Sequence, residues 1–329
     1  MTDVLRPRTT ADEAADATQG LTSESLSPTR MAMKRFMHHK AAVVALIVLV
    51  LLTVFVVLAP ITARYGVNEQ VFETSAERPN FNQPPQSVAW LGTDDIGRDL
   101  YSRLIYGLRV SLLIGLASAV MSTIIGVSVG SIAGLKGGRF ANILMRVTDL
   151  FLAFPILVTL MIMRSVLASI PWLEPITGPI TSIRFVIVLF VLFGWMGVAR
   201  IMRGQVLALK EREFIEASRA LGAGNFRIIF KHLIPNSIGP ILVALTFAVS
   251  SAIIAESTLA FFGYGPQPGA GATSLGILVS NSQGALLPGY WWLVVFPGAL
   301  LVLVALCINF VGDGLRDATD PKLDMGGGS

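Results

Sequence analysis

The sequence predicts an all-α integral membrane protein with about six transmembrane helices. Of its 329 residues, 53% are hydrophobic and only 14% are charged, whereas soluble domains carry roughly 25% charged residues. The mean hydropathy is +0.68, and apolar runs close to the ~20 residues that cross a bilayer recur along the chain. One cysteine and three histidines leave no disulfide framework and predict no metal site.

The first apolar run, residues 41–59, contains no charged residue. Forty mostly polar residues precede it, which is long for a cleaved signal peptide, so we expect a retained helix over 36–62. Residues 1–35 show no apolar period, and their composition predicts a disordered cytoplasmic tail. The final run 326–329, Gly-Gly-Gly-Ser, is typical of an engineered linker.

Five further apolar stretches complete the predicted set of spans. They cover 111–135, 141–163, 185–201, 237–262 and 291–311. Pro155 interrupts the stretch 141–163, which is the third predicted span. Neighbouring helices can satisfy the backbone groups that such an interruption leaves unpaired. We therefore expect an extracytoplasmic segment at 63–106, a transmembrane core at 107–312 and a cytoplasmic tail at 313–325.

The basic residues set the orientation of the predicted spans. With six spans and the N-terminus inside, 18 of the 25 lysines and arginines fall in cytoplasmic segments and the other seven fall outside. The positive-inside rule then places both termini in the cytoplasm. Because this topology accounts for the net charge of +4, the charge indicates a lipid bilayer as partner and no nucleic acid.

Small side chains recur every four residues along the second span. They are Ser118, Ser122, Gly126, Gly130 and Gly134. At 3.6 residues per turn these positions form one slowly drifting stripe, which lets another helix backbone approach closely. Helix packing is the favoured interpretation, and direct lining of a solute path is the alternative.

The loop at 203–236, between the fourth and fifth spans, is charged and yet keeps apolar positions at helical spacing. Four apolar residues between 214 and 221 predict an amphipathic helix, and the Gly-Ala-Gly run at 222–224 predicts its end. A second short helix is expected over 225–233, and Pro235 suits the start of the fifth span. Such a feature is either a surface that a partner grips or a solvated loop.

The same loop resembles the pattern of ABC importer permeases, which reads E-A-A, three residues, G, nine residues and I-x-L-P. The matching residues are Glu216, Ala217, Ser218, Gly222, His232 and Pro235. Ser218 stands where the family has alanine and His232 where it has isoleucine, although His-x-x-Pro-Asn is common in the peptide-importer branch. The resemblance implies a coupling helix that sits in a groove of an ATPase subunit, where Glu216 pairs with a basic residue.

Further motifs similar to those of the C-type permeases of dipeptide, oligopeptide and nickel importers run along nearly the whole chain. They are LGTDDIGRD at 91–99, MRVTD at 145–149, ESTLAFFG at 256–263 and NFVGDGLRD at 309–317. Leu275 departs from the family, which usually has tryptophan there, and this departure bears on the outer-loop contacts. The resemblance implies the type I ABC importer permease fold.

The resemblance also implies an assembly in the bacterial inner (plasma) membrane. Its other members are a homologous second permease, two ABC ATPase subunits and an extracytoplasmic solute-binding protein. ATP and magnesium then bind the ATPase subunits, and this chain binds no cofactor. The residues agree, because the sequence contains no G-x-x-x-x-G-K-[ST] phosphate loop, no G-x-S-x-G elbow and no H-E-x-x-H motif. No catalytic residue is assigned, and the chain is not an enzyme by itself.

Polar residues outside the loop have two predicted roles. The charged residues within 94–99 resemble a catalytic or metal cluster, but their place beside glycines in a loop favours a structural turn with internal salt bridges. Glu256 lies in an apolar span, where an ionisable group is a functional candidate by default. We expect Glu256, Phe261 and Phe262 at a gate or on the substrate path, with a carboxylate at the membrane interface as the alternative for Glu256.

The predicted function is that of a permease subunit that forms half of a translocation path for di- or oligopeptides. The same importer family carrying nickel or another small solute is the first alternative. An ion-coupled secondary transporter is an alternative from another class, and it needs coupling-ion sites at broken helices near the midplane. The loop around Glu216 discriminates between the classes, because a secondary transporter has no use for it.

Overall fold

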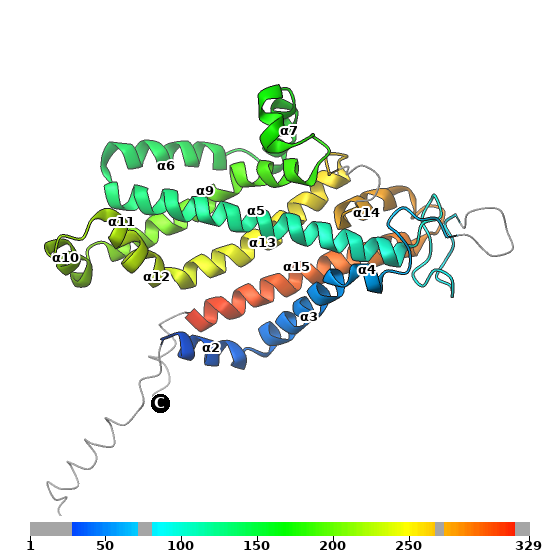
Figure 1. Cartoon of the computed structure of the whole chain (residues 1–329), viewed down its shortest axis with the longest axis horizontal. Coiled ribbons are helices and arrows are strands. Elements are labelled where there is room, and N and C mark those ends of the chain that lie inside the picture. The colour runs from blue at the N-terminus through cyan, green and yellow to red at the C-terminus, as the bar shows by residue number, and fades with distance from the viewer. Residues whose placement is uncertain (1–27, 72–80, 267–272, 320–329) are drawn as a thin grey trace, which may run out of the picture.

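The protein is described by a computed structural model that covers residues 28–71, 81–266 and 273–319. In these ranges the chain is a bundle of helices joined by loops and turns (Figure 1). Two isolated β-bridges lie in the segment before α5 (Leu100–Lys136). Five of the described helices are long and apolar enough to cross a membrane. They are α3 (Lys40–Val57), α5 (Leu100–Lys136), α9 (Ile183–Leu209), α13 (Ile238–Phe261) and α15 (Trp291–Thr319). The predicted all-α membrane fold is confirmed.

The third predicted span, 141–163, is not one straight helix. α6 (Gly138–Leu152) and α7 (Ile156–Ala168) meet at 98°, and the pair supplies a sixth span only if it crosses the membrane as one broken unit. The break falls at Pro155, the residue before α7, whose ψ of 115° is extended. Proline has no N–H to continue the hydrogen-bond ladder of α6, so the helix ends there.

Two helices extend beyond their predicted ends. α5 begins at Leu100, so the predicted extracytoplasmic segment 63–106 ends inside a helix. Asp99 caps this start, because its Oδ2 accepts hydrogen bonds from Ser102 N at 2.9 Å and from Ser102 Oγ at 2.6 Å. α15 likewise continues to Thr319, past the predicted end of the core at 312.

The close packing of α5 against α9 forms the centre of the bundle, and the stripe of small residues makes it possible. A Cβ added to Gly126 would lie 2.7 Å from Trp195 O and 2.6 Å from Val198 Cβ. A Cβ at Gly130 would overlap Ala199 O, and one at Gly134 would lie 2.6 Å from Val206 Cβ. The predicted packing role of the stripe is confirmed for these three glycines.

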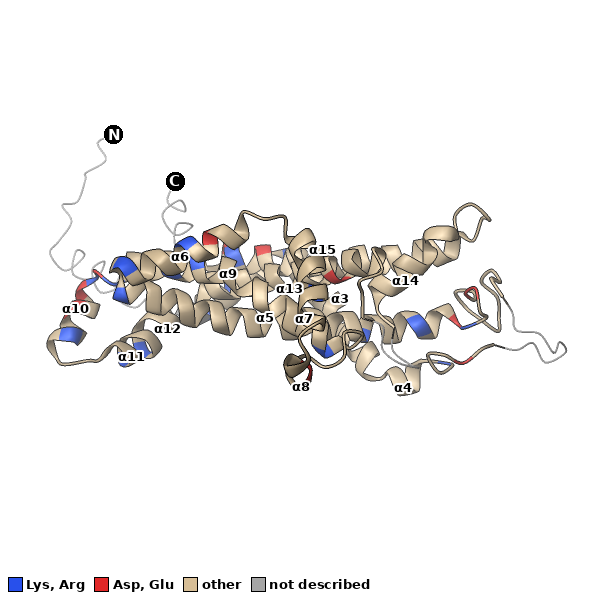
Figure 2. Cartoon of the chain, turned by 90° about the horizontal axis from the view of Figure 1, so that it is seen from above, with Lys and Arg blue, Asp and Glu red and all other residues tan. Residues whose placement is uncertain are grey.

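The loops gather at two opposite ends of the bundle (Figure 1). The α10 end holds α10 (Glu213–Ala220), α11 (Asn225–Ile228) and α12 (Ile234–Asn236), and near it lies α2 (Pro28–His38). The α14 end holds α4 (Ala59–Thr62) and α14 (Leu275–Asn281), while α8 (Glu174–Thr177) follows α7. Figure 2 shows lysine and arginine residues gathered toward the α10 end.

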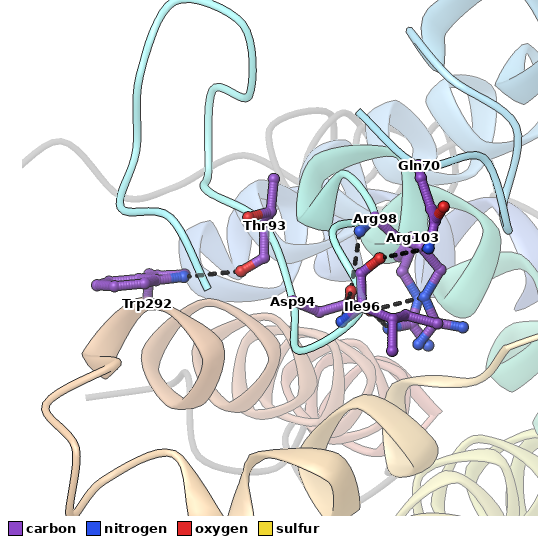
Figure 3. A network of polar contacts seen from close by, with 7 residues as sticks. All are labelled: Gln70, Thr93, Asp94, Ile96, Arg98, Arg103 and Trp292. Atoms are coloured by element: carbon purple, nitrogen blue, oxygen red, sulfur yellow. Dashed lines mark hydrogen bonds and ion pairs between the residues drawn. The ribbon is translucent and has the colours of Figure 1, made fainter. Parts of the chain in front are cut away.

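The segment before α5 is held by a network around Asp94 (Figure 3). Asp94 Oδ2 accepts a hydrogen bond from Arg98 Nε at 2.7 Å and forms an ion pair with the buried Arg103 of α5. Trp292 of α15 donates from Nε1 to Thr93 O at 3.2 Å. The predicted structural turn with internal salt bridges is therefore confirmed, and it joins α5 to α15.

Replacing Gly130 with alanine is expected to destabilise the protein, because the new methyl group overlaps the backbone of α9. Overpacking of this kind costs about 1–3 kcal/mol. The matched control is Gly204→Ala in α9, where an added Cβ meets no atom within 4 Å and helix propensity favours alanine by up to about 1 kcal/mol. Thermal unfolding in detergent measures both variants, and equal midpoints would contradict this account of the α5–α9 contact.

Asp94→Asn is expected to lower stability strongly, since it leaves Arg103 without its carboxylate partner. Removing one member of a buried ion pair costs about 3–5 kcal/mol. Asp95→Asn is the control, because Asp95 is the adjacent, exposed aspartate. The same thermal unfolding measurement separates the two, and a similar small change for both would show that the Asp94 network does not hold the segment.

Candidate functional site

The loop around Glu216 folds as two short helical pieces on the end of α9, much as predicted. Residues 203–209 belong to α9, and the loop itself starts at Lys210. α10 is attached through Ile215, which is fully buried in a cluster with Ile228 and Leu233. Ile215 is the one buried residue of α10, so it is the buried apolar contact through which this helix packs on the bundle.

The residues that match the family pattern present most of their surface to the outside. Glu216 and Ala217 are exposed on α10, and Glu216 forms no ion pair within the described ranges. Gly222 ends the helix with φ +83°, a left-handed conformation that favours glycine. Leu221 beside it is 87% exposed. Glu216, Ala217 and Gly222 are therefore accessible at the tip of the loop.

The two departures from the family pattern lie next to each other in space. Ser218 Oγ is 3.3 Å from His232 Nε2, and the His232 ring is also 6.1 Å from the ring of Phe214, one turn earlier on the same face of α10. Asn236 Nδ2 donates to His232 O at 2.6 Å. His232 thus connects α10 to α12, within a π-helical turn over Ile229–Leu233, a feature frequent at functional sites.

Pro235 does not start the fifth span as predicted. It is an exposed residue of α12, and α13 begins only at Ile238. Ser237 lies between the two helices and breaks their continuity, with φ −105° and ψ 6°. The path from the loop into the membrane therefore has a break that the sequence pattern did not predict.

Glu256 lies toward the other end of the bundle, far along α13 from the loop. It is fully buried inside the bundle, and the predicted alternative of a carboxylate at the depth of the membrane interface stays a prediction. Its Oε1 accepts a hydrogen bond from Ser274 Oγ at 2.6 Å and its Oε2 accepts one from Ser111 Oγ at 3.1 Å. Ser111 Oγ in turn accepts from Leu275 N at 3.0 Å. This network fastens the start of α14 to α5 and α13.

Phe261 and Phe262 lie at the end of α13, one turn beyond Glu256. Their rings pack edge to face with centroids 5.6 Å apart, and both side chains are exposed. Phe261 O accepts a hydrogen bond from Gln283 Nε2 at 2.8 Å. The structure therefore brings these two residues to the α14 end together with Glu256, although Glu256 is buried and the two phenylalanine side chains are exposed.

A groove of about 770 Å³ runs along the bundle between α5, α7, α9 and α13. Its polar lining consists of Ser118, Ser122, Ser251, Thr319 and Arg316, and its apolar wall includes Leu160, Phe190, Phe193 and Phe247. Ser118 Oγ is buried there without a hydrogen-bond partner in the described ranges. Two serines of the small-residue stripe therefore line the groove, while its glycines serve packing.

Arg164 is a buried charge one residue beyond the predicted span 141–163. It lies on α7 and is 6% exposed. It donates to Gly265 O at 3.0 Å and to Ile180 O at 3.2 Å, and it pairs with no carboxylate of the described ranges. Its position next to an apolar, helix-forming stretch could have identified it from the sequence. A charged residue inside a membrane segment is a candidate for a functional or positioning role.

Comparison with known families decides the identity of the chain. Residues 126–325 match the family described as binding-protein-dependent transport system inner membrane component. The chain belongs to this family. Residues 27–85 of the permease also match the N-terminal transmembrane domain of oligopeptide transport permease C, so the two matches include both α3 and the loop around Glu216.

Relatives of known name cover nearly the full length of the permease. It is 40% identical over 314 residues to the oligopeptide transport system permease protein OppC of Bacillus subtilis, covering 95% of each chain. It is 38% identical over 299 residues to the dipeptide transport system permease protein DppC of the same organism, covering 91% of this chain and 87% of the relative.

A solved structure shares the fold of the permease. A chain of the MetNI methionine ABC transporter in an inward-facing conformation matches it with a TM-score of 0.53 at 23% identity, covering 66% of this chain and 96% of that chain. The permease therefore has the type I ABC importer fold, and it is a multi-pass membrane protein.

Glu256→Ala is expected to loosen α14, because it leaves the buried hydroxyls of Ser111 and Ser274 without their acceptor. Such unpaired groups cost about 1–3 kcal/mol. Hydrogen–deuterium exchange of residues 275–281 should accelerate in this variant. Glu174→Ala, which removes an exposed carboxylate, is the control. Unchanged exchange of 275–281 in Glu256→Ala would show that the network does not hold α14.

Proposed function

We propose that this permease forms one half of the solute path of an ATP-driven importer for di- and oligopeptides. The names of the relatives OppC and DppC support the solute class. The observation that carries the mechanism is the geometry of α10, whose exposed Glu216 and Ala217 form a surface for another protein. A solute path alone has no use for such a surface.

The proposed assembly contains a second, homologous permease, two ABC ATPase subunits and an extracytoplasmic solute-binding protein. The α10 end faces the cytoplasm, because lysine and arginine gather there (Figure 2) and cytoplasmic loops carry the excess of these residues. Both termini then lie in the cytoplasm of a bacterial cell. ATP and magnesium bind the ATPase subunits, and this chain supplies neither the catalytic groups nor a cofactor site.

The coupling step follows from the contacts of α10. When the ATPase subunits close on ATP, a force on Glu216 and Ala217 moves α10. That motion reaches the bundle through the buried Ile215 and through the contact between Ser218 and His232. α12 and then α13 receive it next, so the groove along α13 changes shape. ATP therefore biases the population of the outward-open state.

The groove lining favours a peptide over a metal ion as solute. Its lining residues include no His, Cys, Met, Asp or Glu within the described part of the chain, and these are the side chains that bind transition metals. Serine hydroxyls in an apolar wall hydrogen-bond to amide groups without selecting a side chain. At the α14 end we propose that Glu256, Phe261 and Phe262 form a gate, with Glu256 holding α14 rather than touching solute.

Glu216→Arg is expected to abolish or weaken binding of the ATPase subunits, because it reverses the charge of the exposed carboxylate that we expect to pair with a basic residue of the ATPase. The measurement is co-purification of the ATPase with the tagged permease from detergent-solubilised membranes, with peptide uptake and ATP hydrolysis assayed in proteoliposomes. We expect a loss of roughly tenfold or more, as for truncation of a central interface charge pair.

Glu213→Arg is the matched control for this experiment, since it makes the same charge reversal on an exposed residue of α10 one turn earlier. It should retain most of the bound ATPase. If no ATPase copurifies with the wild-type permease and uptake runs on an ion gradient alone, the importer proposal is wrong and a secondary transporter takes its place.

A further inference from the structure

The short helix α2 directly precedes the first membrane-crossing helix. It ends at His38, and α3, the first membrane-crossing helix, begins at Lys40. His39 separates them and caps α3, because its Nδ1 accepts a hydrogen bond from Ala42 N at 3.1 Å. Figure 1 shows the chain changing direction at this point. Since one residue separates α2 from the span, the helix cannot be far from the lipid surface.

One face of α2 is already occupied by α15. Phe36 is 6% exposed and packs with Ala42 and Ala318. A Cβ added to Gly314 would lie 3.1 Å from Phe36 Cε2, so the two helices are in close contact. This contact fixes which sides of α2 remain free.

The free sides of α2 carry methionines and basic residues in separate positions around the helix. Met33 and Met37 are 63% and 58% exposed, and Arg30 and Lys34 are exposed as well. At about 100° per residue, Met33 and Met37 lie between Phe36 and the basic pair, and Met31, which is 38% exposed, lies on the other side of that pair. The sequence of α2, Pro28–His38, contains no acidic residue. This order, from protein face to apolar flank to basic flank, is that of a helix lying in a membrane interface.

We propose that α2 binds the anionic phospholipid surface of the bilayer, with Met33 and Met37 among the acyl chains and Arg30 and Lys34 on the phosphates. Charge complementarity supports this occupant, because basic clusters immediately beside a transmembrane helix attract anionic lipids. A protein partner would leave the apolar and basic flanks in no particular relation to the plane of the membrane. A lipid surface requires the order that α2 shows.

The anchored helix also bears on the solute path. The end of α15 that α2 contacts carries Arg316 and Thr319, which line one end of the groove. Thr319 packs against the start of α13, where a Cβ on Gly239 would lie 2.8 Å from Thr319 Cβ. His39 Nε2 lies 3.6 Å from Asp317 Oδ2 of the same turn. Lipid binding by α2 therefore stabilises the α10 end of the groove.

The direct test uses a fluorophore on Met33→Cys in a Cys307→Ser background, since Cys307 is the chain's one cysteine. The full-length permease, with any subunits that copurify, is reconstituted in phosphatidylcholine vesicles with or without phosphatidylglycerol, either lipid carrying bromine as a quencher. We expect brominated phosphatidylglycerol to quench several-fold more than brominated phosphatidylcholine at equal content. The preference should disappear when Arg30→Gln and Lys34→Gln are combined, and it should weaken at high salt.

The matched control removes two exposed charges of α6 at the same end of the bundle, Arg139→Gln with Arg146→Gln. It should keep the quenching preference. Peptide uptake should rise with phosphatidylglycerol in the wild type and in this control, and not in the α2 variant. Equal quenching by the two brominated lipids, or the same loss in the control, would overturn the proposal. The quenching measurement requires no transport, so a failure of the importer proposal leaves its result interpretable.

Discussion

The contact between α5 and α9 determines where everything else in the permease can lie. Between helices in lipid there is little hydrophobic driving force, so association depends on close van der Waals packing. Gly126, Gly130 and Gly134 bring the two backbones together because no side chain separates them. α9 leads directly into the loop around Glu216, and α5 leads from the Asp94 network. Both ends of the molecule are therefore positioned by one helix pair.

The two ends are built in opposite ways, and each suits its proposed role. The α10 end presents a helix that is held by one buried side chain, Ile215, and by polar contacts to His232. The α14 end is fastened by the buried carboxylate of Glu256 and by the ion pairs of Asp94. A weakly held element can follow a partner that moves, whereas a buried polar network holds a single arrangement.

Much of this arrangement could be predicted from the sequence, because it depends on local patterns. The apolar runs predicted that the chain is a membrane protein, and the Gly-Ala-Gly run at 222–224 predicted the turn of the loop. The 98° bend at Pro155 could not be derived, since proline allows either a kinked span or a re-entrant pair. The Glu256 network was also out of reach, because its partners Ser111 and Ser274 come from distant segments that only the fold brings together. The burial of Arg164 depends on carbonyl groups of two loops for the same reason.

The length of α5 has a mechanical consequence for whatever docks at the α14 end. Its 37 residues rise about 55 Å at 1.5 Å per residue, well beyond the ~30 Å of a hydrocarbon core. The excess turns begin at the Asp99 cap and carry Arg103, which the Asp94 network grips. α5 thus connects the Asp94 network to the glycine stripe as one continuous helix. A load applied to the segment before α5 is transmitted along this helix to α9, without passing through any flexible joint.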